Sequence, residues 1–124
     1  MTTLICTLEA LQYAAEINRS IRFRYVREPV AAVVLEDARE GHPAFLILHQ
    51  GSAIAFENVC PHRATELDWN PGDVFDESGL YLICATHGAL FLPATGVCVS
   101  GPCTKQQLKK VAVITEKGGV HLAG

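Results

Sequence analysis

Two short stretches of the chain each place a cysteine close to a histidine. The first holds Cys60 and His62 with one residue between them, and the second holds Cys84 and His87 with two residues between them. Thiolate sulfur binds soft metals, and imidazole nitrogen binds zinc, copper and iron. Two thiolates and two imidazoles in separate loops therefore predict a metal site that both loops build together.

The mixed composition of each loop favours one kind of centre. A [2Fe–2S] cluster can have two cysteines on one iron and two histidines on the other, so that each loop gives one ligand to each iron. The alternative is a structural zinc ion with Cys₂His₂ ligands, but such zinc sites usually draw on closely spaced pairs of like residues. The spacing favours the cluster and leaves zinc open as a second interpretation.

The remaining cysteines and histidines have simpler interpretations. Four of them are isolated in the sequence, where a buried thiol or a hydrogen-bonded histidine explains each: Cys6, His42, His49 and His121. Cys98 and Cys103 lie close together in the sequence. We expect two thiols there, because a reducing compartment opposes a disulfide, although pairing between them stays open.

Size and composition limit the domain organisation and the partners. The chain has 124 residues, a length typical of one domain, so we expect a single domain over residues 1–124. A formal net charge of −3 offers no basic surface to nucleic acid. No apolar run is long enough to cross a bilayer, and residues 1–9 lack the pattern of a secretory signal. Five cysteines fit a bound metal in a reducing cytoplasm better than a secreted disulfide framework.

Short segments with strand patterns surround the two loops and are separated by turn residues. The expected strands are residues 4–8, 21–26, 31–35, 44–49, 53–58, 80–84, 89–92, 97–99, 111–115 and 120–122. Residues 9–16 carry helix formers at helical spacing, so a helical turn and an irregular edge are both open there. Many short strands with turn signals predict an all-β protein, an antiparallel sandwich or small barrel.

The two loops and the residues after them resemble a Rieske iron–sulfur domain. The resemblance covers about Phe45 to Val113 and rests on Cys60-Pro61-His62, Cys84-Ala85-Thr86-His87-Gly88-Ala89-Leu90-Phe91, Thr95-Gly96 and Gly101-Pro102. It implies a Rieske-type antiparallel β-sandwich or barrel of three sheets, with a small cluster-binding subdomain at about residues 58–103. It also implies that Cys60 and Cys84 hold the inner iron of a [2Fe–2S] cluster, and that His62 and His87 hold the outer iron. The loop with Gly101 and Pro102 would cover the cluster.

Several positions differ from the Rieske proteins of respiratory cytochrome complexes. Those proteins carry one extra cysteine in each ligand loop, joined as a disulfide, where this chain has Thr65 and Thr86. They also place a serine and a tyrosine hydroxyl near the cluster sulfurs, where this chain has Ala89 and Phe91. Because hydrogen bonds to the sulfurs stabilise the more negative reduced state, we expect a low potential. In its low potential the chain is similar to the ferredoxins and oxygenase components of bacterial ring-hydroxylating systems. Arg63, which follows the first predicted histidine ligand, resembles the oxygenase form.

The resemblance implies a one-electron carrier between a reductase and a terminal oxygenase or another oxidoreductase. Its partners would be redox proteins that contact the surface around Pro61, Arg63, Gly88 and residues 101–103. We do not expect an enzyme on its own, because the chain leaves no room for a second domain with a catalytic iron. A small accessory subunit, similar to that of assimilatory nitrite reductase, is a further hypothesis beside the structural zinc domain.

Overall fold

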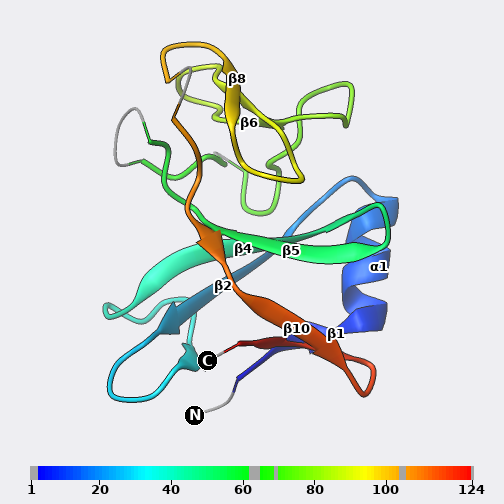
Figure 1. Ribbon diagram of the computed structural model, residues 1–124, viewed down its shortest axis with the longest axis vertical. Helices are drawn as coiled ribbons and strands as arrows, with labels where there is room; N and C mark the ends of the chain where they lie inside the picture. Colours follow the sequence, from blue (N-terminus) through cyan, green and yellow to red (C-terminus); the bar gives the residue numbers. More distant parts are fainter. Residues whose placement is uncertain (1–2, 62–64, 69, 104–105, 124) are drawn as a thin grey trace.

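The computed structural model describes residues 3–61, 65–68, 70–103 and 106–123. These residues form eleven strands in three antiparallel sheets and one helix (Figure 1), which confirms the all-β prediction. Among them, no helix is long and apolar enough to cross a membrane. One domain over residues 1–124, with a cluster-binding subdomain at about 58–103, stays a prediction.

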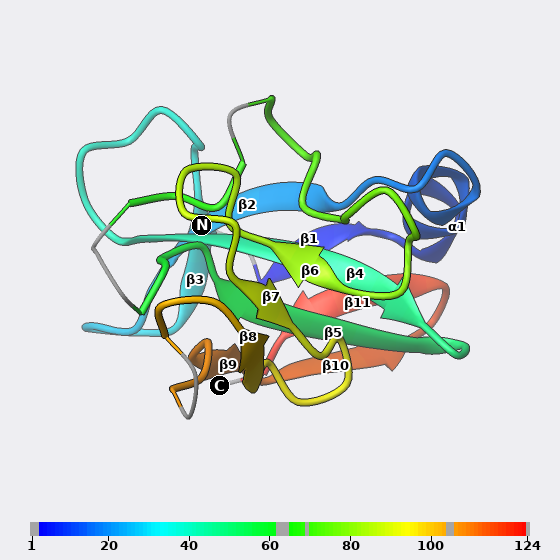
Figure 2. The same ribbon diagram turned by 90° about the horizontal axis from the view of Figure 1, so that it is seen from above.

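The largest sheet has five strands in the order β3-β2-β4-β5-β9. Its strands are β2 (Ile21–Val26), β3 (Ala32–Val34), β4 (His42–His49), β5 (Ser52–Glu57) and β9 (Lys110–Val111). The second sheet consists of β1 (Leu4–Thr7), β11 (Gly119–Leu122) and β10 (Val113–Glu116), in that order. The third consists of β6 (Leu82–Ile83), β7 (Leu90–Phe91) and β8 (Cys98–Ser100). Figures 1 and 2 show this third sheet above the five-stranded sheet, with the second sheet on the opposite side.

The central strand β4 contributes to two separate hydrophobic cores. Successive side chains of a strand point to opposite faces of the sheet. Phe45 and Ile47 therefore pack into an upper core toward the third sheet, whereas Ala44 and Leu46 pack into a lower core toward the second sheet. All four are buried. The upper core consists of Phe45, Ile47, Phe56, Cys60, Leu67, Val74, Leu82, Cys84, Ala89, Phe91, Cys98, Cys103 and Leu108. Both predicted cysteine ligands thus lie in the upper core.

A helix, α1 (Leu8–Glu16), decides the alternative left open for residues 9–16. Thr7 caps its N-terminus, because the Thr7 hydroxyl accepts a hydrogen bond of 3.1 Å from the backbone N–H of Ala10. Leu11 and Ala14 are buried and share the face that packs into the lower core, with Leu11 a member of that core. Figure 1 shows the helix beside one end of the five-stranded sheet.

The prediction of a single strand at residues 111–115 is wrong. β9 pairs with β5 in the five-stranded sheet, whereas β10 pairs with β11 in the second sheet, and Ala112 separates the two strands. The apolar residues continue across this break, so the sequence carries no sign of it. The strands predicted at 80–84 and 89–92 are shorter than expected, because the residues next to them form the ligand loop described below.

Tyr25 of β2 makes the stability of the fold sensitive to alkaline pH. Its side chain is fully buried, and its hydroxyl donates a hydrogen bond of 2.5 Å to Oε2 of Glu57. Burial, followed by this hydrogen bond, raises the pKa of Tyr25 from 10.0 to about 12. A raised pKa means that the folded state disfavours tyrosinate. The stabilising contribution is therefore complete below pH 10 and is lost as the pH rises through about 12.

We expect the free energy of unfolding to fall by roughly 3 kcal/mol over this alkaline range, because the pKa rises by about two units and one unit corresponds to about 1.4 kcal/mol. The pKa itself can be measured in the near-ultraviolet, as the difference between the alkaline titrations of the wild-type protein and of Tyr25→Phe. The variant should lack the alkaline decrease in stability that belongs to Tyr25. A difference titration with its midpoint near the ordinary tyrosine value would contradict this prediction.

Candidate metal centre

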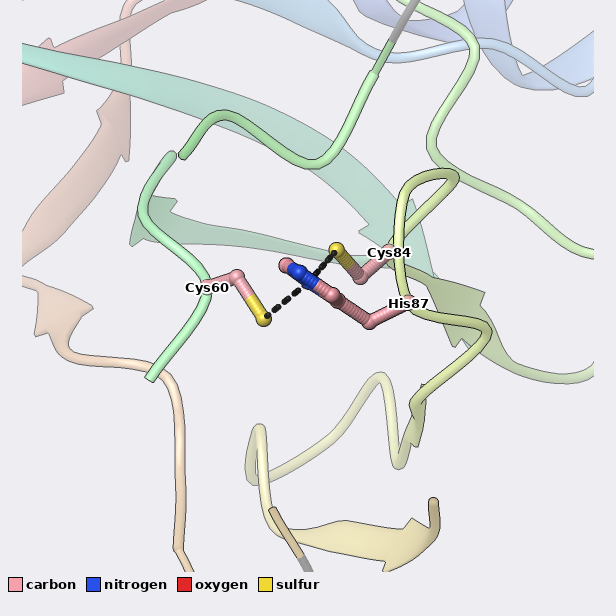
Figure 3. Close-up of side chains that lie close together, drawn as sticks. All are labelled: Cys60, Cys84 and His87. Carbon is pink, nitrogen blue, oxygen red and sulfur yellow. Dashed lines mark hydrogen bonds between the residues drawn. The ribbon is translucent and has the colours of Figure 1, made fainter. Parts of the chain in front are cut away.

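Three of the four predicted ligands come together in the structure. One ligand atom from each of Cys60, Cys84 and His87 lies within 4.8 Å of the others. Nδ1 of His87 is 3.9 Å from the Cys60 Sγ and 3.5 Å from the Cys84 Sγ, and Figure 3 shows the imidazole reaching toward both sulfurs. The two cysteines are buried and His87 is half-buried. His62 lies outside the residues that the structure describes.

Short backbone hydrogen bonds shape the loop that carries Cys84 and His87. The loop begins where β6 ends, and the N–H of Cys84 donates to the carbonyl oxygen of Ala89 at 3.0 Å. The N–H of Gly88 returns to the carbonyl oxygen of Cys84 at 2.7 Å. Gly88 has a φ of 72°, in the left-handed region that glycine adopts at little cost. This tight return brings the His87 ring back over the Cys84 sulfur.

The first loop follows β5 and is joined to the second loop through its backbone. Within it, the N–H of Cys60 donates to the carbonyl oxygen of Thr65 at 2.8 Å. Between the loops, the N–H of Ala85 donates to the carbonyl oxygen of Leu67 at 2.8 Å. The two loops are therefore held together by a hydrogen bond next to Cys84, and not by the predicted ligands alone.

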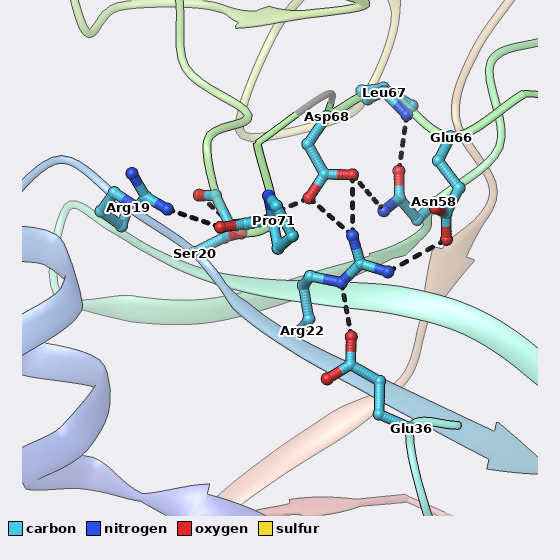
Figure 4. A network of polar contacts seen from close by, with 10 residues as sticks. Arg19, Ser20, Arg22, Glu36, Asn58, Glu66, Leu67, Asp68 and Pro71 are labelled. Carbon is cyan, nitrogen blue, oxygen red and sulfur yellow. Dashed lines mark hydrogen bonds and ion pairs between the residues drawn. The ribbon is translucent and has the colours of Figure 1, made fainter. Parts of the chain in front are cut away.

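A buried carboxylate, Asp68, connects the first loop to Arg22, and Figure 4 shows it between Arg22 and Asn58. Its side chain has no exposed surface and accepts hydrogen bonds from the Asn58 amide at 2.9 Å and from the Gly72 N–H at 2.8 Å. The side-chain oxygen Oδ1 of Asn58 in turn accepts a hydrogen bond of 2.8 Å from the backbone N–H of Leu67. Asn58 at the start of the first loop is thus hydrogen-bonded to Leu67 and Asp68 at its end. These bonds close the loop that contains Cys60.

Arg22 of β2 provides the opposite charge for this network. Its guanidinium contacts both carboxylate oxygens of Asp68, at 3.3 and 3.2 Å, and also binds Glu66 at 3.2 Å and Glu36 at 2.5 Å. Burial alone would lower the pKa of Arg22, but the hydrogen bond to Glu36 and the charges of Asp68 and Glu66 raise it above its ordinary value. The guanidinium therefore stays charged and ties the sheet to the ligand loop.

Sequence reasoning missed this network. The alternation of residues 21–26 predicted a half-buried strand, and Arg22 is indeed partly exposed along it. The partners of Arg22 come from positions 36, 66 and 68, and nothing in the local pattern connects these positions. One signal in the sequence is that Asp68 follows the apolar Leu67 close behind the first cysteine–histidine pair. A carboxylate there could have suggested a buried partner for a basic residue.

The chemistry of the grouped donors fits an iron–sulfur cluster. Burial raises the pKa of the Cys84 thiol, and a positively charged metal is what would stabilise its thiolate. Buried thiols beside an imidazole suit a soft metal. At the distances given above, three donors could also bind a single ion, so the choice between the cluster and zinc needs a further observation.

That observation is the match to a protein family. The family of the Rieske [2Fe-2S] domain matches residues 21–115 of this chain. The chain belongs to the Rieske [2Fe-2S] domain family. The group that this Rieske domain carries is accordingly a [2Fe–2S] cluster, and its function is one-electron transfer. The structural zinc site, which the spacing had left open, is not favoured.

Solved structures show the same fold. The ferredoxin of Sphingomonas yanoikuyae B1 has a TM-score of 0.62 and 20% identity, covering 100% of this chain and 99% of that one. The plasma membrane Rieske protein of the cyanobacterium Synechocystis PCC 6803 has a TM-score of 0.67 and 15% identity, covering 99% and 100%. The ferredoxin of carbazole 1,9a-dioxygenase from Nocardioides aromaticivorans IC177 has a TM-score of 0.64 and 19% identity, covering 99% and 97%. A search of curated proteins finds no match.

The loop predicted to cover the cluster lies against the second ligand loop of this Rieske domain. Gly101 has a φ of 103°, and a Cβ placed there would lie 2.8 Å from the Cα of Ala89. That distance is shorter than any ordinary contact of a side chain. Gly101 therefore allows the cover loop to approach the backbone that accepts the hydrogen bond from Cys84.

Ala89 offers a test of the predicted low potential. Ala89 is fully buried beside the ligand loop and has no hydroxyl to donate. We expect Ala89→Ser to raise the midpoint potential of the cluster, because a hydrogen bond to a cluster sulfur favours the reduced state. The rise should be on the order of 50 mV, since about 59 mV changes a one-electron equilibrium tenfold. Spectroelectrochemical titration measures it, with the exposed Ala112→Ser as control; equal potentials in the two variants would contradict the prediction.

Proposed function

We propose that this Rieske domain carries single electrons between a reductase and a terminal oxygenase, with Cys60, His62, Cys84 and His87 holding the cluster. The observation that carries this proposal is the difference in burial within the grouped donors. The Cys60 and Cys84 side chains are at most 1% exposed, whereas His87 is half-buried and its neighbour Gly88 is exposed. One side of the site is thus sealed and the other approaches the surface.

When bound, the cluster accepts and returns one electron at a time. The protein residues keep the thiol side dry, because Phe91, Leu82 and other side chains of the upper core surround Cys60 and Cys84. The His87 side gives a partner a short path to the site. Two exposed apolar residues stand next to cysteines of the upper core, namely Val59 before Cys60 at 37% exposure and Val99 after Cys98 at 44% exposure. Such residues suit a transient contact with another protein.

The proposed partners follow from the solved relatives. One similar chain is the ferredoxin of carbazole 1,9a-dioxygenase from Nocardioides aromaticivorans IC177, and another belongs to a complex of reduced oxygenase and oxidized ferredoxin in carbazole 1,9a-dioxygenase. By analogy with these ferredoxins, this chain would have no turnover of its own. It would instead supply electrons to a separate catalytic protein. Its five cysteines without disulfide bonds would suit the reducing cytoplasm.

The first experiment is a visible absorption and electron paramagnetic resonance spectrum of the purified protein, before and after reduction with dithionite. A rhombic signal with the low average g value of histidine-ligated clusters is expected after reduction. A colourless protein with stoichiometric zinc would overturn the proposal. Stopped-flow mixing then follows reduction by a flavin reductase and reoxidation by a terminal oxygenase. Stoichiometric copurification with one large subunit, without exchange, would indicate an accessory subunit instead.

A further inference from the structure

A second pair of cysteines, which are not predicted ligands, lies in the upper core together with Cys60 and Cys84. Cys98 is the first residue of β8, and Cys103 follows the exposed segment 99–102. The Cys103 Sγ lies 3.0 Å from the Cys98 Sγ, and no bond joins them in this structure. The two residues are 2% and 1% exposed.

Backbone hydrogen bonds hold these two thiols in place. The N–H of Cys98 donates to the carbonyl oxygen of Gln106 at 2.8 Å, and the N–H of Gln106 donates to the carbonyl oxygen of Cys103 at 2.9 Å. The Cys98 thiol donates to the carbonyl oxygen of Ser100 at 3.3 Å, and the Cys103 thiol donates to the Cys98 sulfur. The close approach of the sulfurs is therefore built into the loop.

We propose that Cys98 and Cys103 form a reversible disulfide when a hydroperoxide is the oxidant. A disulfide bond is about 2.05 Å long, so the sulfurs need to approach by only about 1 Å. Two S–H bonds break and one S–S bond forms. The two electrons and two protons pass to hydrogen peroxide, whose O–O bond breaks to give two water molecules. A thiol reductant reverses the step by exchange.

The position of the pair gives this disulfide a consequence for the metal centre. The segment between the cysteines contains Gly101, which packs against Ala89 of the second ligand loop. Ala89 accepts the backbone hydrogen bond from Cys84. Closing the disulfide joins Cys98 of β8 to Cys103 and so cross-links the two ends of segment 99–102. This is the segment that covers the second ligand loop. Oxidation should therefore slow the opening of the segment and the loss of the cluster.

The simpler interpretation is that both cysteines only fill the core. Free cysteine commonly behaves as a small buried hydrophobic residue. Under that interpretation the thiols stay unbonded when peroxide is added, because both are buried and burial raises the pKa of the Cys103 thiol to about 12, which keeps it protonated and unreactive. The two interpretations thus differ in an outcome that can be counted, and the count does not depend on any electron-transfer partner.

The test is a count of free thiols after treatment of the cluster-loaded protein with hydrogen peroxide. The treated protein is denatured, alkylated, digested with trypsin and analysed by mass spectrometry. Residues 64–105 contain no lysine or arginine before Lys105, so Cys84, Cys98 and Cys103 remain in one tryptic peptide. We expect three alkyl groups on this peptide before treatment, and one after treatment, located on Cys84. Dithiothreitol should restore all three. The peroxide concentrations are those that leave the visible spectrum of the cluster unchanged.

Two variants make the result specific. Cys98→Ser and Cys103→Ser should each keep both remaining thiols free after the same treatment, and Cys98→Ala replaces the first variant if it does not fold. The rate of cluster loss to a chelator should fall several-fold on oxidation of the wild-type protein and stay constant in the variants. Three alkyl groups after treatment, or a bond that includes Cys84, would overturn the disulfide. An unchanged rate of cluster loss would overturn its effect on the covering segment. If the protein proves colourless, the thiol count still decides the disulfide, so failure of the proposed function is seen separately.

Discussion

Replacing Cys84 with alanine is expected to abolish cluster binding. Cys84 is fully buried, and its sulfur lies 3.5 Å from Nδ1 of His87. A cluster needs thiolate ligands, and among the residues that the structure describes no other thiol is grouped with Cys60 and His87. Changes to residues that only support a metal ligand typically cost about 10 to 100-fold in affinity. Loss of the ligand itself should therefore weaken cluster binding by more than about 100-fold, so that the purified variant holds almost no iron or sulfide.

The control for this variant is Cys6→Ala. Cys6 is half-buried in β1 and packs against the lower core, on the other side of the five-stranded sheet from the site. The control should keep its full content of iron and sulfide and an unchanged visible spectrum. Iron that stays bound to Cys84→Ala at the wild-type ratio would remove Cys84 from the proposed ligand set. Circular dichroism of both variants separates loss of the cluster from loss of the fold.

The second large effect is expected for Asp68→Ala. This change removes the acceptor for Asn58, Gly72 and Arg22 and leaves the Arg22 guanidinium without its buried partner. Removing one partner of a buried ion pair typically costs about 3 to 5 kcal/mol. Because Arg22 is 20% exposed and keeps Glu36 and Glu66, we expect a loss near the lower end, about 3 kcal/mol. Denaturant unfolding measures it.

Asp73→Ala is the matched control, since Asp73 lies in the same loop and is exposed. Exposed substitutions of this kind usually change the free energy of unfolding by less than about 0.5 kcal/mol. The network also predicts that Asp68→Ala loses its cluster faster than Asp73→Ala, because Asn58 and Asp68 hold both ends of the first ligand loop. Equal stability of the two variants would show that the network contributes nothing to the fold.

Local features of the sequence predicted the elements that depend on neighbouring residues. The strands predicted at residues 44–49 and 53–58 are an example, because β4 and β5 lie there and are joined by a tight turn in which Gln50 and Gly51 have φ values of 51° and 81°. The spacing of the cysteines and histidines likewise predicted a metal centre, and the longer motifs around them carried the resemblance to the Rieske family. For helix α1 the sequence left two alternatives open, a helical turn and an irregular edge. The cap at Thr7 and the burial of Leu11 in the lower core stabilise the helix.

What the sequence determined by itself is a metal centre, the resemblance to its family and most strands, because these depend on residue types and motifs that are close together in the chain. The tertiary structure alone decided which segments meet. It separated β9 from β10 by pairing them with different sheets, brought Arg22 to Asp68 and placed the Cys103 sulfur against Cys98. These contacts depend on the order of strands in the sheets and on the path of the loops. Neither is encoded in the local pattern of apolar and polar residues.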